Sequence, residues 1–393
     1  MTASAGGRDL AAPVLAGVVT AVVGFTSSFA VVLAGLRAVG ASPEEAASGL
    51  LALTLAFAAG IIGLALWHRI PITLAWSTPG AALLVGTGVV DGGWPAAVGA
   101  FVVAGALFVA TGYVGWLGRL VARIPTGVAQ AMLAGVLLPL VLAPVEAVAD
   151  VPALALPVVL VWLAVVRWAP RWSVPAALAA ALVVIAVELV RTDTPVTGSL
   201  APTLTWTTPA FTPAALIGIA LPLYVVTMAS QNVPGVAVLR SFGYDAPWRS
   251  SMAVTGVGTA VGAPFGGHAI NLAAISAALA AGEEAGPDRD RRWIAAVSAG
   301  VTYVVLALAS GALSSVTAAA PGGLVETVAG LALLGAFGAA VAAALADAAT
   351  RTSAVVTFLV AAGGLSVGGI GAAFWALVAG LVVRAVVERP VRE

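Results

Sequence analysis

Polar side chains recur at helical spacing within an otherwise apolar stretch of the sequence. The members of this polar stripe are Tyr224, Thr227, Ser230, Gln231 and Asn232. Hydrocarbon offers such groups no hydrogen-bond partner, so inside a membrane they must face protein or water. The stripe therefore predicts groups that bind a polar solute. Hydrogen bonding between neighbouring helices is the alternative role of Gln231 and Asn232.

Two clusters of helix-breaking residues interrupt apolar sequence, STPG at residues 77–80 and APFGGHAIN at residues 263–271. Broken backbone at membrane depth persists only where it is buried in protein or lines a cavity. We expect residues 72–76 to be extended and a half-helix to begin at Pro79, capped by Ser77 or Thr78. A second half-helix is expected after the cap Gly266-Gly267-His268. The alternative is that both clusters are kinks packed by their neighbours.

A helix N-terminus presents unpaired N–H groups and the positive end of the helix dipole. Two such ends facing one cavity predict a site for an anionic group such as a carboxylate. Neighbouring aromatic side chains would supply the walls for an aromatic acid, although core packing is the alternative role of each. The candidate substrate-binding residues are Phe25, Trp76, Ser77, Thr78, Gly80, Tyr224, Thr227, Gln231, Asn232, Phe265, Gly266, Gly267 and Asn271.

Two titratable residues are candidates for coupling transport to a proton. His268 adjoins the second break, and an imidazole changes its charge between about pH 5 and pH 8. Its alternative role is that of a neutral hydrogen-bonding group. Asp347, four residues before Arg351, is the second candidate, with an interfacial ion pair as its alternative role. Moving one negative charge against an inside-negative potential costs about 2.3 kcal/mol per 100 mV, so a co-transported proton would remove this cost.

Composition defines the broad class of the protein. Of 393 residues, 61% are hydrophobic and 9% are charged, and the mean hydropathy is +1.09. Soluble domains carry about a quarter of charged residues, so the chain is predicted to be a polytopic membrane protein. A net charge of zero argues against a nucleic-acid partner, and the absence of cysteine excludes disulfides and thiolate metal sites. No metal and no cofactor are expected.

The elements that must position these groups are membrane-spanning helices. At roughly 20 residues per crossing, the length allows about twelve to fourteen spans and no separate soluble domain. Broken spans are predicted at residues 71–91 and 265–281. Helices are predicted at residues 12–39 (interrupted at 24–28), 43–69, 95–116, 125–145, 152–168, 173–190, 212–233, 246–263, 292–318, 323–347, 352–368 and 371–388. We therefore predict an all-α fold of about fourteen spans.

The two halves of the chain, residues 1–195 and 210–393, resemble each other weakly. Residues 23–40 run parallel to residues 226–243, and each is followed by a helix and then a broken short span. With an odd number of spans in each half, the second repeat is inverted in the membrane. If the N-terminus is cytoplasmic, all 17 arginines except Arg37 and Arg191 fall in inside loops. This imbalance predicts a protein of the cytoplasmic membrane with both termini inside the cell.

Three stretches resemble the signature sequences of the benzoate/proton symporter (BenE-type) family: AWSTPGAALL, TMASQNVPGVAVLRSFGY and APFGGHAINLAAISAAL. The resemblance covers essentially the whole chain and implies a relation to uracil/xanthine permeases and sulfate-type anion carriers. It implies a fold of two inverted repeats of seven spans. In that fold, spans three and ten each combine a short strand with a half-helix and meet spans one and eight around the substrate.

The same resemblance bears on the choice of substrate. Nucleobase carriers of this fold place acidic residues in spans eight and ten, where this sequence has Gln231 and either Ile270 or Asn271. Recognition of a nucleobase by carboxylates is therefore not expected. The expected lack of a soluble C-terminal domain differs from the sulfate-type carriers.

The leading hypothesis is proton-coupled uptake of benzoate or a similar aromatic carboxylate. A carrier of the same fold for nucleobases or inorganic anions is the first alternative, and a channel or membrane-embedded enzyme is the second. The sequence shows no metal-ligand cluster, phosphate-binding Gly-Lys loop or nucleophile–base pair, so no enzyme is expected. The expected partners are a small aromatic carboxylate, a proton and the lipid bilayer. The sequence does not decide between a monomer and a homodimer.

Overall fold

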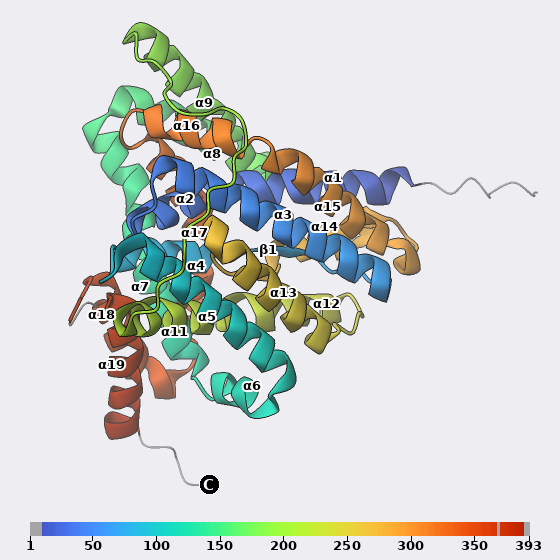
Figure 1. Ribbon diagram of the computed structural model, residues 1–393, viewed down its shortest axis with the longest axis vertical. Coiled ribbons are helices and arrows are strands. Elements are labelled where there is room, and N and C mark those ends of the chain that lie inside the picture. The colour runs from blue at the N-terminus through green and yellow to red at the C-terminus, as the bar shows by residue number, and fades with distance from the viewer. Residues whose placement is uncertain (1–9, 368–369, 389–393) are drawn as a thin grey trace, which may run out of the picture.

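The fold is almost entirely helical and surrounds one short pair of strands. A computed structural model describes residues 10–367 and 370–388, and of residues 120–122 and 275 it describes only the backbone (Figure 1). The predicted cytoplasmic residues Arg8, Arg389 and Arg392 lie outside the described part. In the first half the elements are α1 Ala11–Thr26, α2 Phe29–Ala38, α3 Pro43–His68, β1 Leu74–Trp76, α4 Thr78–Thr87, α5 Gly93–Tyr113, α6 Gly115–Ala122, α7 Thr126–Asp150, α8 Pro152–Trp168 and α9 Ser173–Arg191.

The second half of the chain also contains both long and interrupted elements. Its elements are α10 Pro213–Ala215, α11 Leu221–Thr227, α12 Val233–Ser241, α13 Trp248–Gly262, β2 Ile270–Leu272, α14 Ile275–Ala281, α15 Trp293–Ala307, α16 Ser310–Ala319, α17 Leu324–Leu345, α18 Arg351–Ala362 and α19 Ala372–Val387. Most of these helices match the predicted ranges, and the helix that begins at Pro213 and the second half-helix are the exceptions discussed below.

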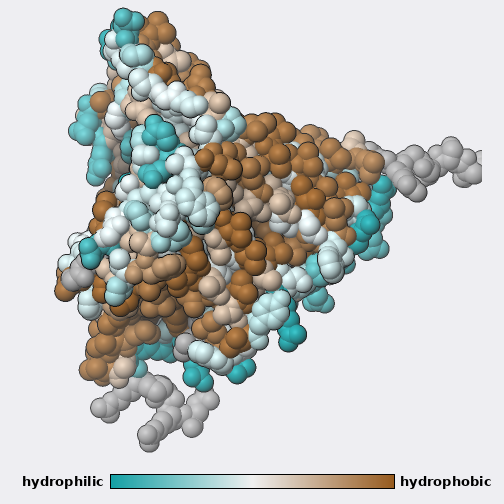
Figure 2. All heavy atoms as spheres, in the orientation of Figure 1, coloured by the Kyte–Doolittle hydropathy of each residue, from teal (hydrophilic) through white to brown (hydrophobic). Residues whose placement is uncertain are grey.

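The described helices have the length and apolar composition of membrane-spanning helices. Seven of them are long and apolar enough to cross it, and α15 and α16 together form an eighth span bent by 52°. Three shorter apolar helices cover Pro152–Trp168, Ala348–Ala362 and Ala372–Val387. Hydrophobic residues cover much of the visible face, while hydrophilic residues gather at two opposite sides of the view (Figure 2). The structure is therefore a mostly helical membrane-type fold, and the count of about fourteen spans stays a prediction.

Local sequence signals fix the start of α3 and the break between α1 and α2. Ser42 and Glu45 form a capping box, in which the backbone N–H of Glu45 donates to Ser42 Oγ (3.2 Å) and that of Ser42 to Glu45 Oε2 (2.8 Å). These bonds satisfy N–H groups that a helix start leaves unpaired. Between α1 and α2 the helix is interrupted at Ser27 and Ser28, and both hydroxyls donate back to the carbonyl of Gly24. The predicted interruption of the first span is confirmed.

One predicted helix boundary is wrong. We expected a helix to end at residue 233, but it continues through Pro234 from Pro213 to Ser241. Two five-residue π-turns, Leu216–Ala220 and Met228–Asn232, allow this continuation. A proline lacks the N–H and displaces the carbonyl four residues earlier, and for Pro222 and Pro234 that carbonyl lies inside a π-turn. The wider turn accommodates each proline without ending the helix.

The polar loop 192–212 joins the two halves and is fastened to α3 and α5. The backbone N–H of Thr205 donates to Ser48 Oγ (2.8 Å), and the indole N–H of Trp94 donates to Thr207 Oγ1 (3.0 Å). The N–H of Thr207 also donates to the Pro264 carbonyl (2.7 Å). The loop thus holds the end of α13, directly before the second broken segment.

The helices pack in two groups with the strand pair inside one of them. Helices α7, α17, α18 and α19 pack chiefly on one another, as do α8 and α9 beside them. Helices α1, α3, α5, α13 and α15 pack around the strands and the short helices α4 and α14. The contact between α4 and α7 is one of the places where the two groups meet.

Candidate substrate site

The centre of the protein is an antiparallel ribbon with one strand from each half of the chain. In β1 and β2, Leu74 pairs with Leu272, Ala75 with Asn271 and Trp76 with Ile270. Backbone bonds extend the pairing, because the N–H of Ser77 donates to the Ala269 carbonyl (2.8 Å) and that of Ala273 to the Thr73 carbonyl (3.0 Å). The predicted extended segment before Ser77 is confirmed. The two interrupted segments therefore meet at the middle of the fold.

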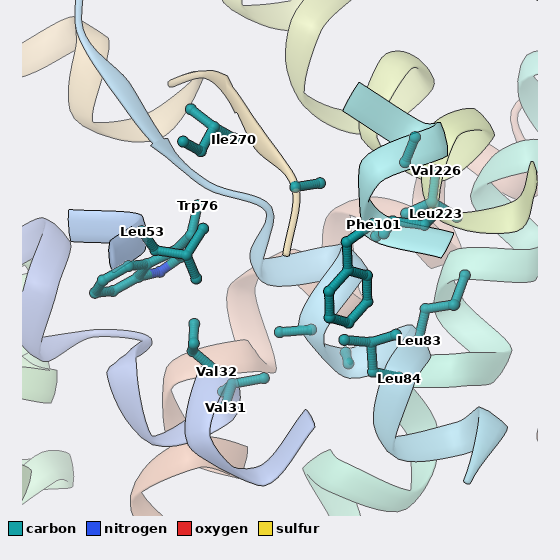
Figure 3. Close-up of a cluster of buried hydrophobic side chains, with 14 of the residues drawn as sticks. Val31, Val32, Leu53, Trp76, Leu83, Leu84, Phe101, Leu223, Val226 and Ile270 are labelled. Atoms are coloured by element: carbon teal, nitrogen blue, oxygen red, sulfur yellow. The ribbon is translucent and has the colours of Figure 1, made fainter. Parts of the chain in front are cut away.

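Buried hydrophobic side chains hold this ribbon in place. They come from helices α2, α3, α4 and α5 of the first half, from α11 of the second half and from the ribbon itself. Members of the cluster are Val31, Val32, Leu53, Trp76, Leu83, Leu84, Phe101, Leu223, Val226 and Ile270 (Figure 3). Burial of such side chains contributes about 1.5–3 kcal/mol each in water-soluble proteins, and in a membrane protein dense packing replaces most of that term.

The first half-helix, α4, begins where the sequence predicts. Ser77 is its N-cap, and its Oγ accepts a hydrogen bond from the Gly80 N–H (3.0 Å). Pro79 fits the first turn because it needs no hydrogen-bond partner there. The helix ends at Thr87, before Gly88 with a positive φ of 69°. Its N-terminus, with Thr78 and Pro79, borders the cavity described below.

The second half-helix begins later than expected. The predicted cap Gly266-Gly267-His268 is wrong, because these residues precede β2 and α14 starts only at Ile275, after Ala274. No side chain caps α14. The Gly-Gly pair instead ends the turn Ala263–Phe265 that follows α13, with Gly266 at φ 91°. A strand needs this reversal before it can run back along β1, which explains the cluster of breakers.

A cavity of about 130 Å³ lies beside the two half-helix starts. An engineered cavity of about 150 Å³ holds a benzene ring, so the volume suits one aromatic ring. The cavity is bounded on one side by Leu137 of α7 and Ala336 of α17, and thus by both helix groups. Its lining residues are Val23, Gly24, Ser27, Ser28, Phe57, Ala75, Trp76, Thr78, Pro79, Leu137, Gln231, Ala273, Ala274, Ser276, Leu279, Tyr303, Ala332, Leu333 and Ala336.

Aromatic rings form one wall of this cavity. The rings of Trp76 and Phe57 meet edge to face with centroids 5.6 Å apart, as do those of Phe57 and Tyr303 at 4.7 Å. Behind them Phe25 packs on Trp76 at 5.3 Å. The indole N–H of Trp76 donates to Ser28 Oγ (2.8 Å), which fixes the orientation of the ring. Such packed rings give a rigid apolar surface with polar edges.

Three of the predicted site residues line the cavity, namely Trp76, Thr78 and Gln231. Others support it from behind. Ser77 Oγ and Thr227 Oγ1 share a hydrogen bond of 2.7 Å, which ties α4 to α11. Gly80 lies close to Leu223, and Phe25 packs behind Trp76. These residues hold the lining residues in position and do not line the cavity themselves.

The remaining residues of the polar stripe and the ribbon serve the scaffold. Tyr224 shares a hydrogen bond of 2.5 Å with Thr111 on α5. Asn232 Oδ1 accepts the backbone N–H of Leu272 (2.9 Å) and so ties the helix to β2. Asn271 Nδ2 donates to the carbonyl of its own neighbour, Leu272 (2.8 Å). None of the three side chains is among those lining the described cavity.

The predicted residues of the second break lie on the side of α3 and the connecting loop. The Phe265 carbonyl accepts the hydroxyl of Ser48 (2.8 Å), and its ring meets that of Trp206 at 5.3 Å. The carbonyl of Gly266 packs on Gly49 so tightly that a Cβ at Gly49 would overlap it. Gly267 faces Leu53. None of these residues lines the described cavity. Strand β2 follows them in the chain, and the residues directly after the strand, Ala273 and Ala274, line the cavity instead.

The two predicted proton carriers also lie away from the cavity lining. His268 is 0% exposed and neither ring nitrogen has a hydrogen-bond partner within the described residues. Its ring meets that of Phe101 at 6.4 Å. Asp347 is exposed and accepts the Ala349 N–H (2.9 Å) as a helix cap. The interfacial ion pair expected for Asp347 is wrong, because the guanidinium of Arg351 donates to the Leu345 carbonyl instead (3.0 Å).

Comparison with known proteins decides the family. A sequence profile described as "Benzoate membrane transport protein" matches residues 9–386. The chain belongs to the benzoate membrane transport protein family. It is 41% identical over 369 residues to the inner membrane protein YdcO of Escherichia coli (strain K12), covering 93% of each chain. It is 28% identical over 382 residues to the benzoate membrane transport protein of Acinetobacter baylyi, covering 96% of this chain and 95% of that one.

Solved structures place this family member in a wider fold group. The transmembrane domain of a cyanobacterium bicarbonate transporter, BicA, aligns with a TM-score of 0.57 at 17% identity over 96% of each chain. The anion transporter SLC26A9 gives a TM-score of 0.64 at 12% identity, over 94% of this chain and 64% of that one. At such identities the likeness concerns the fold alone. The protein is therefore a membrane transporter with an anion-transporter fold, and its relatives are not enzymes.

Several residues that line the cavity of this family member escaped sequence reasoning. Gly24, Ser27 and Ser28 carried a signal, because they lie in the interruption of the first span predicted at residues 24–28. Ser276 and Tyr303 carried none. Nothing in the apolar sequences around them marks them as site residues, and only the packing of α14 and α15 against α1 brings them to the cavity.

Proposed function

We propose that this transporter takes up benzoate or a similar aromatic carboxylate together with a proton. One observation supports this proposal above others. A cavity large enough for one ring has the aromatic wall of Phe57, Trp76 and Tyr303 on one side and the start of α4 on another. The start of a helix favours an anion, and the wall favours a flat apolar ring.

The polar groups of the cavity suit a carboxylate as ligand. Within the described residues, neither the hydroxyl of Thr78 nor the amide of Gln231 has a hydrogen-bond partner, and both line the cavity. Both side chains are half-buried, so they can hydrogen-bond a ligand that enters the cavity. No aspartate or glutamate is among the lining residues, so no fixed negative charge opposes an anion. For the same reason, the lining residues offer no carboxylate that could pair with the N–H groups of a nucleobase.

The charge of the substrate supports a coupled proton. Entry of one negative charge against the membrane potential costs about 2.3 kcal/mol per 100 mV, roughly a fiftyfold disadvantage in concentration. A neutral transported unit of carboxylate plus proton escapes this cost. His268 is the proposed carrier, since it precedes Ala269, whose carbonyl binds the first half-helix at Ser77. A charged imidazole would carry a large desolvation cost at this fully buried site.

Uptake of labelled benzoate into proteoliposomes tests this function. An inward-directed proton gradient is expected to drive accumulation above equilibrium, and dissipating the gradient to abolish it. Competition by unlabelled uracil, xanthine or sulfate would instead identify a carrier for nucleobases or inorganic anions. Uptake that never exceeds equilibration would identify a channel. Absence of any benzoate uptake by the wild-type protein rejects the proposal.

Gln231→Ala is expected to weaken benzoate binding because it removes a free amide from the cavity. Hydrogen bonds to charged groups contribute about 1.5–3 kcal/mol, so KM for benzoate should rise roughly 10- to 100-fold. The matched control is Gln130→Ala on α7, a glutamine that does not line the cavity. An unchanged KM in Gln231→Ala would remove this residue from the proposed site.

His268→Ala is expected to separate coupling from binding. Gradient-driven accumulation should be lost, while exchange of internal for external benzoate continues, because exchange requires no net proton movement. His68→Ala is the control, since His68 is the other histidine of the chain and lies in the last turn of α3. Accumulation at the wild-type level in His268→Ala would show that the imidazole is only a neutral packing group.

We also propose about fourteen spans in two inverted repeats, residues 1–195 and 210–393, with both termini on the cytoplasmic side of the cell membrane. The antiparallel pairing of β1 with β2, one from each half, supports the inversion. Because the chain has no cysteine, single cysteines introduced into loops can be labelled from either side. Labelling of both terminal regions from outside intact cells would contradict the orientation. A homodimer stays a prediction.

A further inference from the structure

Tyr303 of α15 occupies one corner of the cavity. Its side chain is 2% exposed, and its ring is held edge to face against Phe57. The hydroxyl points at Gly24 of α1, so closely that a Cβ at Gly24 would overlap it. Tyr303 is thus fixed by its ring, and its hydroxyl is directed to a position where only a glycine leaves room.

The Tyr303 hydroxyl has no hydrogen-bond partner among the described residues, although it lies deep in the protein. The two other well-buried tyrosines both have one: Tyr224 pairs with Thr111 Oγ1 (2.5 Å), and Tyr244 donates to the Arg289 carbonyl (2.8 Å). A buried tyrosine normally finds a partner for its hydroxyl. The partner of Tyr303 is therefore to be sought in the cavity that it lines.

A second hydroxyl lies at the same corner. The Cβ of Ser276 is 3.9 Å from the Cβ position at Gly24, and Ser276 also lines the cavity. Within the described part of the chain its hydroxyl has no hydrogen-bond partner either. A phenol and an alcohol, both free to donate, with no carboxylate among the lining residues, form a corner that suits an anionic oxygen.

We infer that the Tyr303 hydroxyl donates a hydrogen bond to the carboxylate of the bound aromatic acid, with Ser276 beside it. This inference rests on the proposed function and deepens it, because it assigns recognition of the charged group to α15. That helix belongs to neither of the interrupted segments. The phenol distinguishes a carboxylate from an uncharged head group, since a hydrogen bond to an ion is about twice as strong as a neutral one.

Tyr303→Phe removes one oxygen atom and keeps the ring against Phe57. Equilibrium binding of labelled benzoate to the purified transporter is measured first, and then competition by benzamide, its uncharged analogue. We expect the Kd for benzoate to rise roughly 10- to 100-fold and that for benzamide to change only a few-fold. Tyr244→Phe removes a hydroxyl that does not line the cavity, so it should change neither the Kd for benzoate nor that for benzamide.

The outcomes separate this inference from the proposed function. Selective weakening of benzoate binding supports the hydroxyl as a donor to the carboxylate. An unchanged Kd for benzoate, or equal weakening of benzoate and benzamide, overturns it, because a packing role does not distinguish charge. Failure of the wild-type protein to bind benzoate would instead reject the proposed function. Size-exclusion profiles of both variants confirm that folded protein is compared.

Discussion

Gly24→Leu is expected to reduce benzoate uptake to the background of empty liposomes while the protein still reaches the membrane. A Cβ at this position overlaps the hydroxyl of Tyr303, and the rest of the leucine side chain would extend into the cavity that Gly24 lines. Overpacking of this kind costs about 1–3 kcal/mol, which a large helical protein survives. The substrate, in contrast, loses its space. Uptake of labelled benzoate in proteoliposomes measures the effect.

Gly63→Leu is the matched control for this substitution. Gly63 lies on α3, and a Cβ there meets no atom within 4 Å, so near-normal uptake is expected. The milder Gly24→Ala tests the cause. Beyond the hydroxyl, the nearest atoms are Tyr303 Cζ at 3.5 Å and Ser276 Cβ at 3.9 Å. Adding Tyr303→Phe should therefore restore the stability of Gly24→Ala. Normal benzoate uptake by Gly24→Leu would place the substrate elsewhere.

Asn232→Leu is expected to abolish transport by releasing the second strand from its helix. The fully buried Asn232 accepts the backbone N–H of Leu272 (2.9 Å) and donates to Met228 Sδ (3.3 Å). Leucine has a similar size but leaves the Leu272 N–H unpaired, which costs about 1–3 kcal/mol. We expect a lower thermal unfolding temperature together with loss of benzoate uptake, measured on the same purified sample.

Ser230→Ala provides the comparison on the same helical turn. The Ser230 hydroxyl donates only to the Val226 carbonyl of its own helix (2.5 Å), so its removal frees no group of β2. Unfolding temperature and uptake should remain near those of the wild type. If Asn232→Leu matched Ser230→Ala in both measurements, the bond between this helix and the ribbon would not be needed for transport.

Sequence reasoning succeeded where the cause of a structure is local. Ser77 with Pro79 starts α4, because this signal acts on N–H groups within one turn. The interruption near Ser28 was visible for the same reason. A strand in the second broken segment was expected only from the family resemblance, because the residues themselves were interpreted as the start of a helix.

Sequence reasoning failed where the structure depends on distant contacts. The breakers around Gly266 were read as a helix cap, but they form the reversal before β2, held by Ser48 of α3. A pattern of glycines does not reveal whether a strand or a helix follows. Pro234 was expected to end a helix, but the π-turn at Met228–Asn232 absorbs it. Tyr303 reaches the cavity only through the packing of α15 against α1 and α3.

The most direct test of the central claim is a crystal structure with 4-bromobenzoate, after competition has shown that it binds. The account predicts one anomalous bromine peak in the cavity that Trp76 and Ala336 line, with the carboxylate density at the Tyr303 hydroxyl and Ser276, by the start of α14. A bromine peak at saturating ligand that lies outside this cavity, or a carboxylate directed away from both half-helices, would contradict the account.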